Sequence, residues 1–213
     1  RGLGDVYKRQ GLEDMDAIAV TYGPGLAGSL ITGVNSAKAI AYSLGIPLIG
    51  VNHLEGHIYA SWLAKANLEE DPGFPMACLI ASGGHTDLLV MEGHGKYKLV
   101  GRTRDDAAGE AFDKAARILG LGFPGGPEIQ RVSAGATGDE QLPRAWMKDT
   151  LDFSFSGIKT ALLHMAQDQG IYPSLIDGGD HEHQIRELAA AFQESVVDVV
   201  SAKLVEMAAR FKV

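Results

Sequence analysis

Short apolar runs alternate with longer helical patterns over the first third of the chain. The stretch DAIAVTYGPG (16–25) is an apolar run that ends in a Gly-Pro-Gly turn, which is typical of a buried strand. Residues 26–45 follow as a helix lined with small residues, and Gly45 is its predicted C-cap. The run IPLIGVN (46–52) predicts a second strand, and the next predicted helix carries two histidines. This alternation favours an α/β fold.

A break rich in charge, proline and glycine, EEDPGFP (69–75), separates this region from the rest of the chain. The pattern then predicts strand, tight glycine turn and strand over 76–93, and KYKLVGRT (96–103) extends the pairing. From Asp105 onward the pattern is mostly helical. The last predicted helix spaces its apolar core positions three to five residues apart: Ile185, Leu188, Phe192, Val196, Val199, Leu204, Met207 and Phe211. Together these elements predict an α/β fold of two lobes.

Composition limits the class of protein. The 213 residues are 46% hydrophobic and 22% charged, which suits one large globular domain or two small lobes with a core. The single cysteine, Cys78, lies in an apolar run, which argues against a disulfide scaffold and fits a reducing cytoplasm. No apolar stretch approaches the roughly 20 residues that span a bilayer, so no membrane partner is expected. The net charge of −8 argues against autonomous nucleic-acid binding.

Both ends of the chain lack the signals of a complete domain. Residues 1–10 show no helix or strand period and are interpreted as a non-native scar. The chain stops inside its last predicted helix without a glycine or proline stop signal, so we expect a fragment. Apolar surface along 185–211 is then expected to be exposed.

Two histidines four residues apart, in VNHLEGHIYA (51–60), are the first candidate site. On a helix, His53 and His57 share a face and can reach one metal ion. The zinc-protease motif places its glutamate directly after the first histidine, whereas Glu55 lies two residues after His53 and points away from that face. A pair of polar histidines on a half-exposed helix remains the alternative.

The stretch IASGGHTDLLV (80–90) is the second candidate site. A strand that enters Ser-Gly-Gly and turns back lets backbone N–H groups face outward, which suits phosphate or carboxylate oxygens. An ordinary glycine hairpin is the alternative. The polar set at its tip, namely Ser82, His85, Thr86 and Asp87, favours the binding site.

Three further stretches offer polar or glycine-rich positions. A helix is expected to begin at an N-cap, Asp105 or Asp106, and to carry the ion pairs Glu110–Lys114 and Asp113–Arg117. Residues 122–129, GFPGGPEI, predict a glycine-proline loop that a ligand could approach. In DFSFSGIKTAL (152–162), Asp152, Ser154 and Ser156 at a helix start form either an anion site or a cap.

Six of these motifs occur in the order and approximate spacing of one family: GPGLAGSLITG, NHLEGH, ASGGHTDL, DDAAGEAFDKAARILGL, PGGP and DFSFSGIKTAL. Over residues 11–213 the sequence resembles the tRNA N6-adenosine threonylcarbamoyltransferases in their bacterial form, formerly described as sialoglycoprotein endopeptidases. The resemblance implies the two-lobed α/β fold of actin, the heat-shock ATPases and the sugar kinases, incomplete at both ends. It implies the end of the first lobe, with the metal-binding helix, at 11–75. It also implies the start of the second lobe, with the glycine phosphate turn and a helical insertion, at 76–213.

The resemblance also implies roles for particular residues. His53 and His57 match the two histidines that bind one divalent metal, iron(II) or, as the alternative, zinc(II). The positions that match substrate contacts are Ile80, Ala81, Ser82, Gly83, Gly84, Asp113 and Gly126. The implied partners are threonylcarbamoyl-AMP, tRNA, a partner paralogue and a small ATPase of the same modification complex, in the cytoplasm. No residue is assigned as general base.

Departures from the family pattern limit what these residues are expected to do. The family more often has valine at the position of Ala81. It also has a first glycine turn before Leu12 and, beyond Val213, a third metal ligand, so these residues alone are expected to be inactive. The rival interpretations are a kinase or ATPase of the same fold, a metalloprotease, and a non-catalytic scaffold, against which the histidine pair argues.

Overall fold

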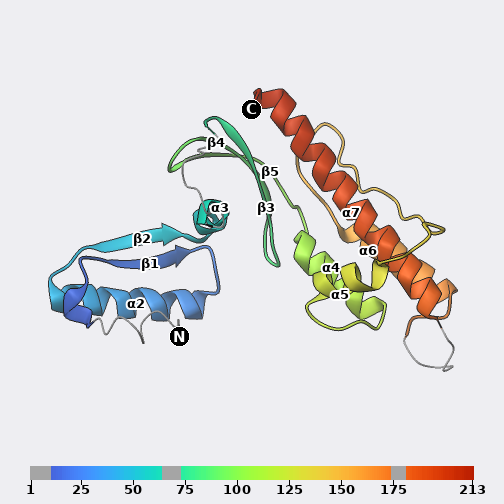
Figure 1. Cartoon of the computed structure of the whole chain (residues 1–213), viewed down its shortest axis with the longest axis horizontal. Coiled ribbons are helices and arrows are strands. Elements are labelled where there is room, and N and C mark those ends of the chain that lie inside the picture. Colours follow the sequence, from blue (N-terminus) through green and yellow to red (C-terminus); the bar gives the residue numbers. More distant parts are fainter. Residues whose placement is uncertain (1–10, 64–72, 174–180) are drawn as a thin grey trace. The chain divides into compact units, whose positions relative to one another are not determined.

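The computed structural model describes residues 11–63, 73–173 and 181–213 (Figure 1). Contacts within the chain divide it into two compact units, Arg1–Asp71 and Pro72–Val213. Each unit has its own sheet, and the two sheets share no strand. The predicted break at 69–75 falls largely outside the described residues.

The first unit combines a two-stranded parallel sheet with helices. Its elements are η1 (Leu12–Asp14), β1 (Ile18–Gly23), α2 (Ala27–Leu44), β2 (Leu48–Asn52) and α3 (His53–Leu63). Strands β1 and β2 pair in parallel from Ile18 and Leu48 onward, and α2 connects them, as a parallel pair requires. Gly45 closes α2 with a φ of 66°, the left-handed conformation that glycine adopts without steric cost. The predicted order of strands and helices is confirmed.

The second unit begins with a three-stranded antiparallel sheet and continues with helices. The sheet has the order β3 (Met76–Ala81), β4 (Thr86–Gly93), β5 (Lys96–Arg102). The helices are α4 (Ala108–Ile118), α5 (Gly125–Ser133), α6 (Ser156–Asp168) and α7 (Glu182–Phe211). The predicted strands and the mainly helical continuation are therefore confirmed. No helix in the described ranges is long and apolar enough to cross a membrane.

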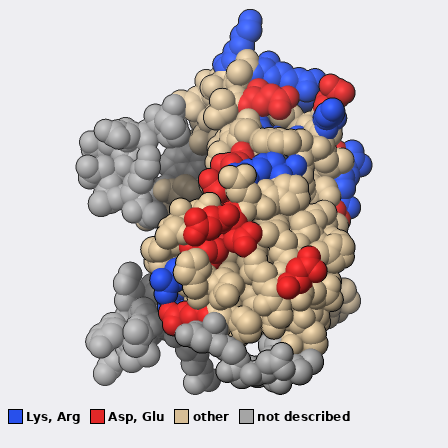
Figure 2. Space-filling view, turned by 90° about the vertical axis from the view of Figure 1, so that its right-hand side faces the viewer, with Lys and Arg blue, Asp and Glu red and all other residues tan. Residues whose placement is uncertain are grey.

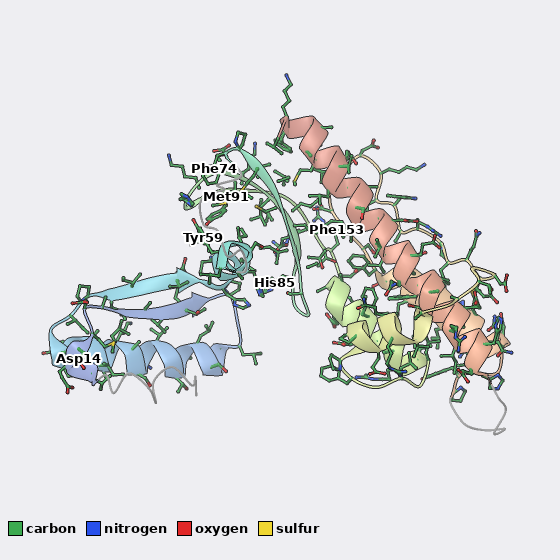
Figure 3. All side chains as sticks on the ribbon, viewed as in Figure 1. Asp14, Tyr59, Phe74, His85, Met91 and Phe153 are labelled. Atoms are coloured by element: carbon green, nitrogen blue, oxygen red, sulfur yellow. The ribbon has the colours of Figure 1, made fainter. Side chains whose placement is uncertain are left out.

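The core of the second unit lies between β4, α4, α6 and α7. Leu88 of β4 and Phe192 of α7 are fully buried, and the ring of Phe192 meets that of Phe112 edge-to-face with centroids 5.3 Å apart. Phe153, labelled in Figure 3, is also fully buried. All eight apolar positions predicted for the last helix are buried or partly buried against this core. Cys78 is buried, as its apolar run indicates.

Large exposed apolar side chains are concentrated in the first unit. Among the described residues eight of them lie there, namely Leu12, Tyr22, Leu26, Ile31, Tyr42, Leu48, Ile49 and Leu63, and the other six lie in the longer second unit. On α7, all of which is described, the exposed large apolar side chains are Val197 and Val205. The expectation of an exposed apolar surface along 185–211 is therefore wrong for most of that helix, because α7 packs against α4, α5, α6 and β3.

An irregular segment, residues 134–155, runs along α7, and polar side chains of that helix hold it (Figure 1). Ser195 donates to the carbonyl of Leu142, and the buried Lys203 donates to those of Met147 and Thr150. The carboxylate of Glu187 accepts the backbone N–H groups of residues 137, 138 and 139 at 2.7, 2.8 and 3.0 Å. Helix α7 therefore buries polar anchors among its apolar positions.

The anchor at Glu187 predicts a pH-dependent stability. Bonds from the loop, chiefly from Thr137 N–H, lower the pKa of Glu187 below its ordinary value despite burial. A carboxylate whose pKa is lowered on folding stabilises above its unfolded pKa, and this contribution disappears as the pH falls through the folded pKa. Glu187→Gln should therefore lower the melting temperature at pH 7, and the difference from wild type should shrink below about pH 4.

Thermal unfolding followed by circular dichroism checks this result. Glu194→Gln is the matched control, because Glu194 lies on the same helix with its side chain 62% exposed. A deficit of Glu187→Gln that is the same at pH 7 and in acid would contradict the assigned role.

Candidate functional site

The predicted glycine turn is present between β3 and β4. Ala81 ends β3, Thr86 begins β4, and the two pair as the last residues before the turn. The N–H of Ser82 donates to the carbonyl of His85 at 2.8 Å, and the N–H of His85 donates to Ser82 Oγ at 3.1 Å. Figure 3 labels His85 at this end of the hairpin and Phe74 and Met91 toward the other. The strand–turn–strand prediction for 80–90 is confirmed.

The backbone of the turn offers two exposed amides rather than the three predicted. Ser82 N–H is used inside the turn, so the prediction that it faces a ligand is wrong. Gly83 and Gly84 are exposed, and a Cβ at either would meet no atom within 4 Å. Their N–H groups have no acceptor among the described residues. These two amides are therefore the part of the turn that can receive anionic oxygens.

Two polar residues near the tip of the turn, Thr86 and Asp87, are buried and do not face a ligand. Thr86 is fully buried, and its hydroxyl accepts the N–H of Ala108 at 2.7 Å. Asp87 is 4% exposed. The predicted polar set is thus reduced to Ser82 and His85 on the accessible side.

Asp113 and Gly126 are brought together by the junction between α4 and α5. Asp113 Oδ1 accepts the N–H of Gly125 at 2.7 Å, so Asp113 does not form the predicted pair with Arg117. The other predicted pair, Glu110–Lys114, is present at 2.8 Å. Among the described residues only Gly125 bonds to the Asp113 carboxylate, which leaves Oδ2 able to accept from a ligand.

The stretch predicted as a glycine-proline loop over 122–129 is largely helical. Helix α5 begins at Gly125, directly after Pro124 at the N-cap position. The structure therefore corrects this prediction for residues 125–129. The helix starts here because Asp113 accepts one of its first N–H groups, which have no partner within a helix.

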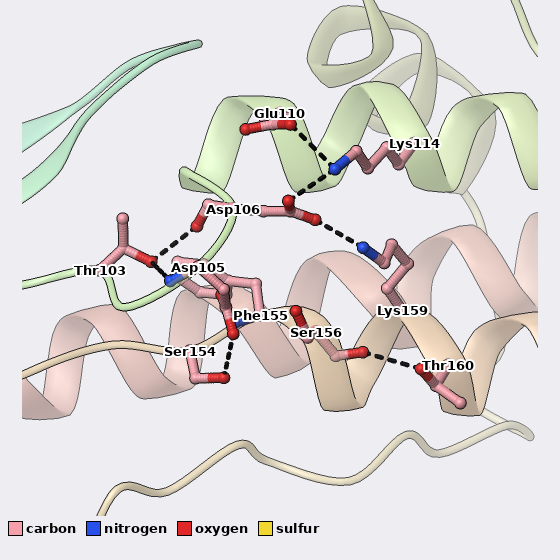
Figure 4. A network of polar contacts seen from close by, with 10 residues as sticks. All are labelled: Thr103, Asp105, Asp106, Glu110, Lys114, Ser154, Phe155, Ser156, Lys159 and Thr160. Atoms are coloured by element: carbon pink, nitrogen blue, oxygen red, sulfur yellow. Dashed lines mark hydrogen bonds and ion pairs between the residues drawn. The ribbon is translucent and has the colours of Figure 1, made fainter.

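The loop before α4 is fixed by a polar network (Figure 4). The prediction that Asp105 or Asp106 caps α4 is wrong, because Ala107 occupies the N-cap position. Asp106 instead contacts Lys114 Nζ at 2.5 Å and Lys159 Nζ at 2.7 Å, and although burial opposes ionisation, these ammonium groups lower its pKa. The network ties α4 to α6.

Asp105 occupies the anion site predicted at the start of α6. Its carboxylate accepts Ser154 Oγ at 2.5 Å and Phe155 N–H at 2.8 Å. Burial opposes ionisation of Asp105, but bonds from Ser154, Phe155 and Ser156 lower its pKa. The anion that this helix start accepts is therefore a side chain of the chain itself.

Asp152, which was also predicted to belong to that anion site, bonds instead to residues at the end of β5. It is 7% exposed, accepts the N–H of Arg102 at 2.9 Å and forms an ion pair with Arg104. It therefore joins residues 152–155 to the end of β5 and is not free to bind a ligand.

The histidine pair lies at the start of α3 in the first unit. Asn52 accepts the N–H of Leu54 through its side chain at 2.8 Å, as an N-cap residue does. The exposed rings of His53 and His57 converge, with their Nε2 atoms 3.1 Å apart. Two imidazole nitrogens bound to one metal at about 2.0–2.1 Å each lie roughly 3.0–3.4 Å apart. The pair fits one metal ion, and a hydrogen bond between the rings gives the same distance.

A second group with metal-ligand chemistry was missed from the sequence. Asp139, His183 and Glu187 place one ligand atom each within 4.8 Å of one another. The spacing of His183 and Glu187, four residues apart on a helix, was the available signal. Both oxygens of Glu187 already accept bonds from the loop at 137–139, which gives this group a structural role.

The described residues define an α/β protein whose second unit presents the exposed amides of a glycine turn and a partly free carboxylate on the following helix. Residues 8–213 match the family described as TsaD, tRNA N6-adenosine threonylcarbamoyltransferase. The chain belongs to this family, which confirms the resemblance seen in its motifs.

Relatives carry the same name. The tRNA N6-adenosine threonylcarbamoyltransferase of Dehalococcoides mccartyi strain BAV1 is 54% identical over 205 residues, 96% of this chain and 58% of that relative. The one of Thermomicrobium roseum is 53% identical over 212 residues, 92% of this chain and 58% of the relative. That of Geobacillus thermodenitrificans is 48% identical over 217 residues, 99% of this chain and 59% of the relative. The chain thus spans somewhat more than half the length of these relatives, whose names do not favour a kinase or protease.

Proposed function

We propose that this chain is the part of a tRNA N6-adenosine threonylcarbamoyltransferase that holds the acyl donor and one metal. The enzyme would move the threonylcarbamoyl group from threonylcarbamoyl-AMP to the N6 amine of the adenosine beside the anticodon, in tRNAs that read ANN codons. One observation carries the proposal. In a member of this family, the exposed amides of Gly83 and Gly84 lie in the same unit as the carboxylate of Asp113 and the backbone of Gly126.

The chemistry asks for orientation and charge stabilisation. The N6 nitrogen attacks the carbamoyl carbon, the bond from that carbon to the phosphate oxygen breaks, AMP leaves, and the nitrogen loses one proton. The amides of Gly83 and Gly84 suit phosphate oxygens, and Asp113 Oδ2 suits a hydroxyl donor of the ligand. The remaining contacts in this proposal are Ala81, Ser82 and Gly126, whereas Ile80, which is 4% exposed, supports the turn from within β3. A base within the described residues is not assigned.

His53 and His57 would hold a divalent metal, iron(II) or alternatively zinc(II), because their Nε2 atoms converge. A bound metal with open positions supplies a Lewis acid and a template for oxygen ligands. We further propose that the two units are parts of the two lobes of an actin-like ATPase fold.

The net charge of this chain is −8, so its overall charge does not attract tRNA. A local basic surface or a partner protein must supply that attraction. On the face in Figure 2, acidic and basic side chains are interspersed and do not form one basic surface. We propose that a partner paralogue and a small ATPase of the modification complex contribute to binding, in the cytoplasm. An adenosine in a single-stranded loop can enter a pocket without opening a duplex.

A chimera tests the proposed activity. The 205 aligned residues of the Dehalococcoides mccartyi relative are replaced by those of this chain. The purified chimera is given threonylcarbamoyl-AMP, tRNA and its partner proteins, and modified adenosine is measured by mass spectrometry. We expect product at a rate within about tenfold of the intact relative, since a tenfold loss corresponds to only about 1.4 kcal/mol of transition-state stabilisation. A folded chimera that forms no product would overturn the proposal.

A further inference from the structure

We infer that Gly109 is a positioning residue that fixes the glycine turn on helix α4, an inference that rests on the proposed function for the ligand that the turn holds. Gly109 is the second residue of α4, and its N–H donates to the carbonyl of Ser82 at 3.1 Å. The backbone of the turn therefore lies directly against the first turn of the helix.

The contact leaves no room for a side chain at position 109. A Cβ there would lie 2.7 Å from the carbonyl oxygen of Ser82 and 2.8 Å from the Cα of Gly83. Both are backbone atoms, so no side-chain rotation relieves the clash, and the turn itself must move. Glycine at 109 thus determines how closely the turn approaches α4.

Thr86 anchors the other end of the same turn. Its buried hydroxyl accepts the N–H of Ala108 at 2.7 Å, and its carbonyl accepts the N–H of Thr103 at 2.9 Å. The first N–H groups of a helix have no partner within the helix. In α4 the consecutive N–H groups of Ala108 and Gly109 bond to the two ends of the turn. These two N–H groups are therefore not available to a ligand.

The same helix positions the other candidate contacts. Asp113 follows Gly109 by four residues, about 6 Å along the axis and on nearly the same face. Gly125 packs against this part of α4, and a Cβ there would lie 2.4 Å from the carbonyl oxygen of Phe112. Helix α4 therefore determines the spacing between the turn, Asp113 and Gly126.

The test compares Gly109→Ala with Gly157→Ala in the full 213-residue chain. Gly157 is the second residue of α6, as Gly109 is of α4, but a Cβ at 157 meets no atom within 4 Å. Amide hydrogen exchange of residues 82–86 is measured by NMR, and AMP is the binding probe. Gly109→Ala should accelerate exchange of Ser82 and weaken AMP binding by roughly tenfold, the scale of one lost hydrogen bond to a charged group. Gly157→Ala should change neither.

A second pair keeps the inference testable if Gly109→Ala does not fold. Thr86→Val keeps the shape but removes the acceptor hydroxyl, whereas Thr86→Ser keeps the hydroxyl. Faster Ser82 exchange and weaker binding in Thr86→Val, with recovery in Thr86→Ser, supports the inference. Unchanged exchange and affinity in Gly109→Ala overturns it, as does the same result in Thr86→Val where Gly109→Ala does not fold. If the wild-type chain does not bind AMP, the proposed function fails, and the exchange rates alone still decide whether Gly109 positions the turn.

Discussion

His53→Ala is expected to weaken metal binding by the first unit. The Nε2 atoms of His53 and His57 are 3.1 Å apart and exposed, so one ion can bind both. Loss of an outer-shell partner of a metal ligand already costs roughly 10- to 100-fold in affinity, and loss of the ligand itself should cost at least as much. The affinity is measured by competition with a chromophoric chelator for Zn²⁺, and by anaerobic titration with Fe²⁺.

The control for this variant is His164→Ala. His164 is exposed on α6, outside the candidate site, so its loss should leave the affinity unchanged. Metal binding should also weaken in acid, because protons compete with the ion for imidazole nitrogens. If His53→Ala binds as tightly as wild type, the converging rings are only a hydrogen-bonded pair. Equally weak metal binding by wild type and His53→Ala would also mean that the two rings form only a hydrogen-bonded pair.

Gly125→Ala should destabilise the protein, whereas Gly126→Ala, at the adjacent position, should not. A Cβ at Gly125 would lie 2.4 Å from the Phe112 carbonyl oxygen and 2.6 Å from Asp113 Cα, whereas at Gly126 it meets no atom within 4 Å. Overpacking of a close contact costs typically about 1–3 kcal/mol. Alanine replaces an unhindered helical glycine with a gain of up to about 1 kcal/mol. Gly125→Ala should therefore lower the free energy of unfolding and Gly126→Ala should not.

Urea unfolding of both variants, followed by fluorescence, measures these differences. Ligand binding separates the pair further, because Gly126→Ala is expected to reduce affinity for threonylcarbamoyl-AMP in a protein of normal stability. If Gly125→Ala is as stable as wild type, α5 does not depend on the close approach to α4.

The elements of this fold were predictable where a local pattern determines them. The glycine pair between two apolar runs identified the turn at 80–90, and Gly45 identified the end of α2. The convergence of His53 and His57 was predictable because residues four apart on a helix share a face. Glycines at the helix-forming positions 109 and 125 were an unused signal, since glycine inside a helical pattern often marks a close contact.

The roles of the carboxylates were not predictable, because their partners are distant in sequence. Asp105 is 49 residues from Ser154, and Asp106 is 53 residues from Lys159. Spacing within one helix suggested caps and i,i+4 pairs, but tertiary partners displaced all of these except Glu110–Lys114. The polar anchors of α7 were missed for the same reason, since the segment they hold has no regular pattern.

Asp113→Asn in the chimera probes the proposal that the turn, Asp113 and Gly126 hold the acyl-adenylate. Asparagine keeps an oxygen that accepts the Gly125 N–H, so the fold should persist. The negative charge that faces the ligand is removed. Asp168→Asn, at an exposed position on α6, is the charge-matched control. We predict that Asp113→Asn raises the KM for threonylcarbamoyl-AMP by roughly tenfold or more, as loss of a hydrogen bond to a charged group implies, without a change in melting temperature. A KM equal to that of Asp168→Asn would contradict the account.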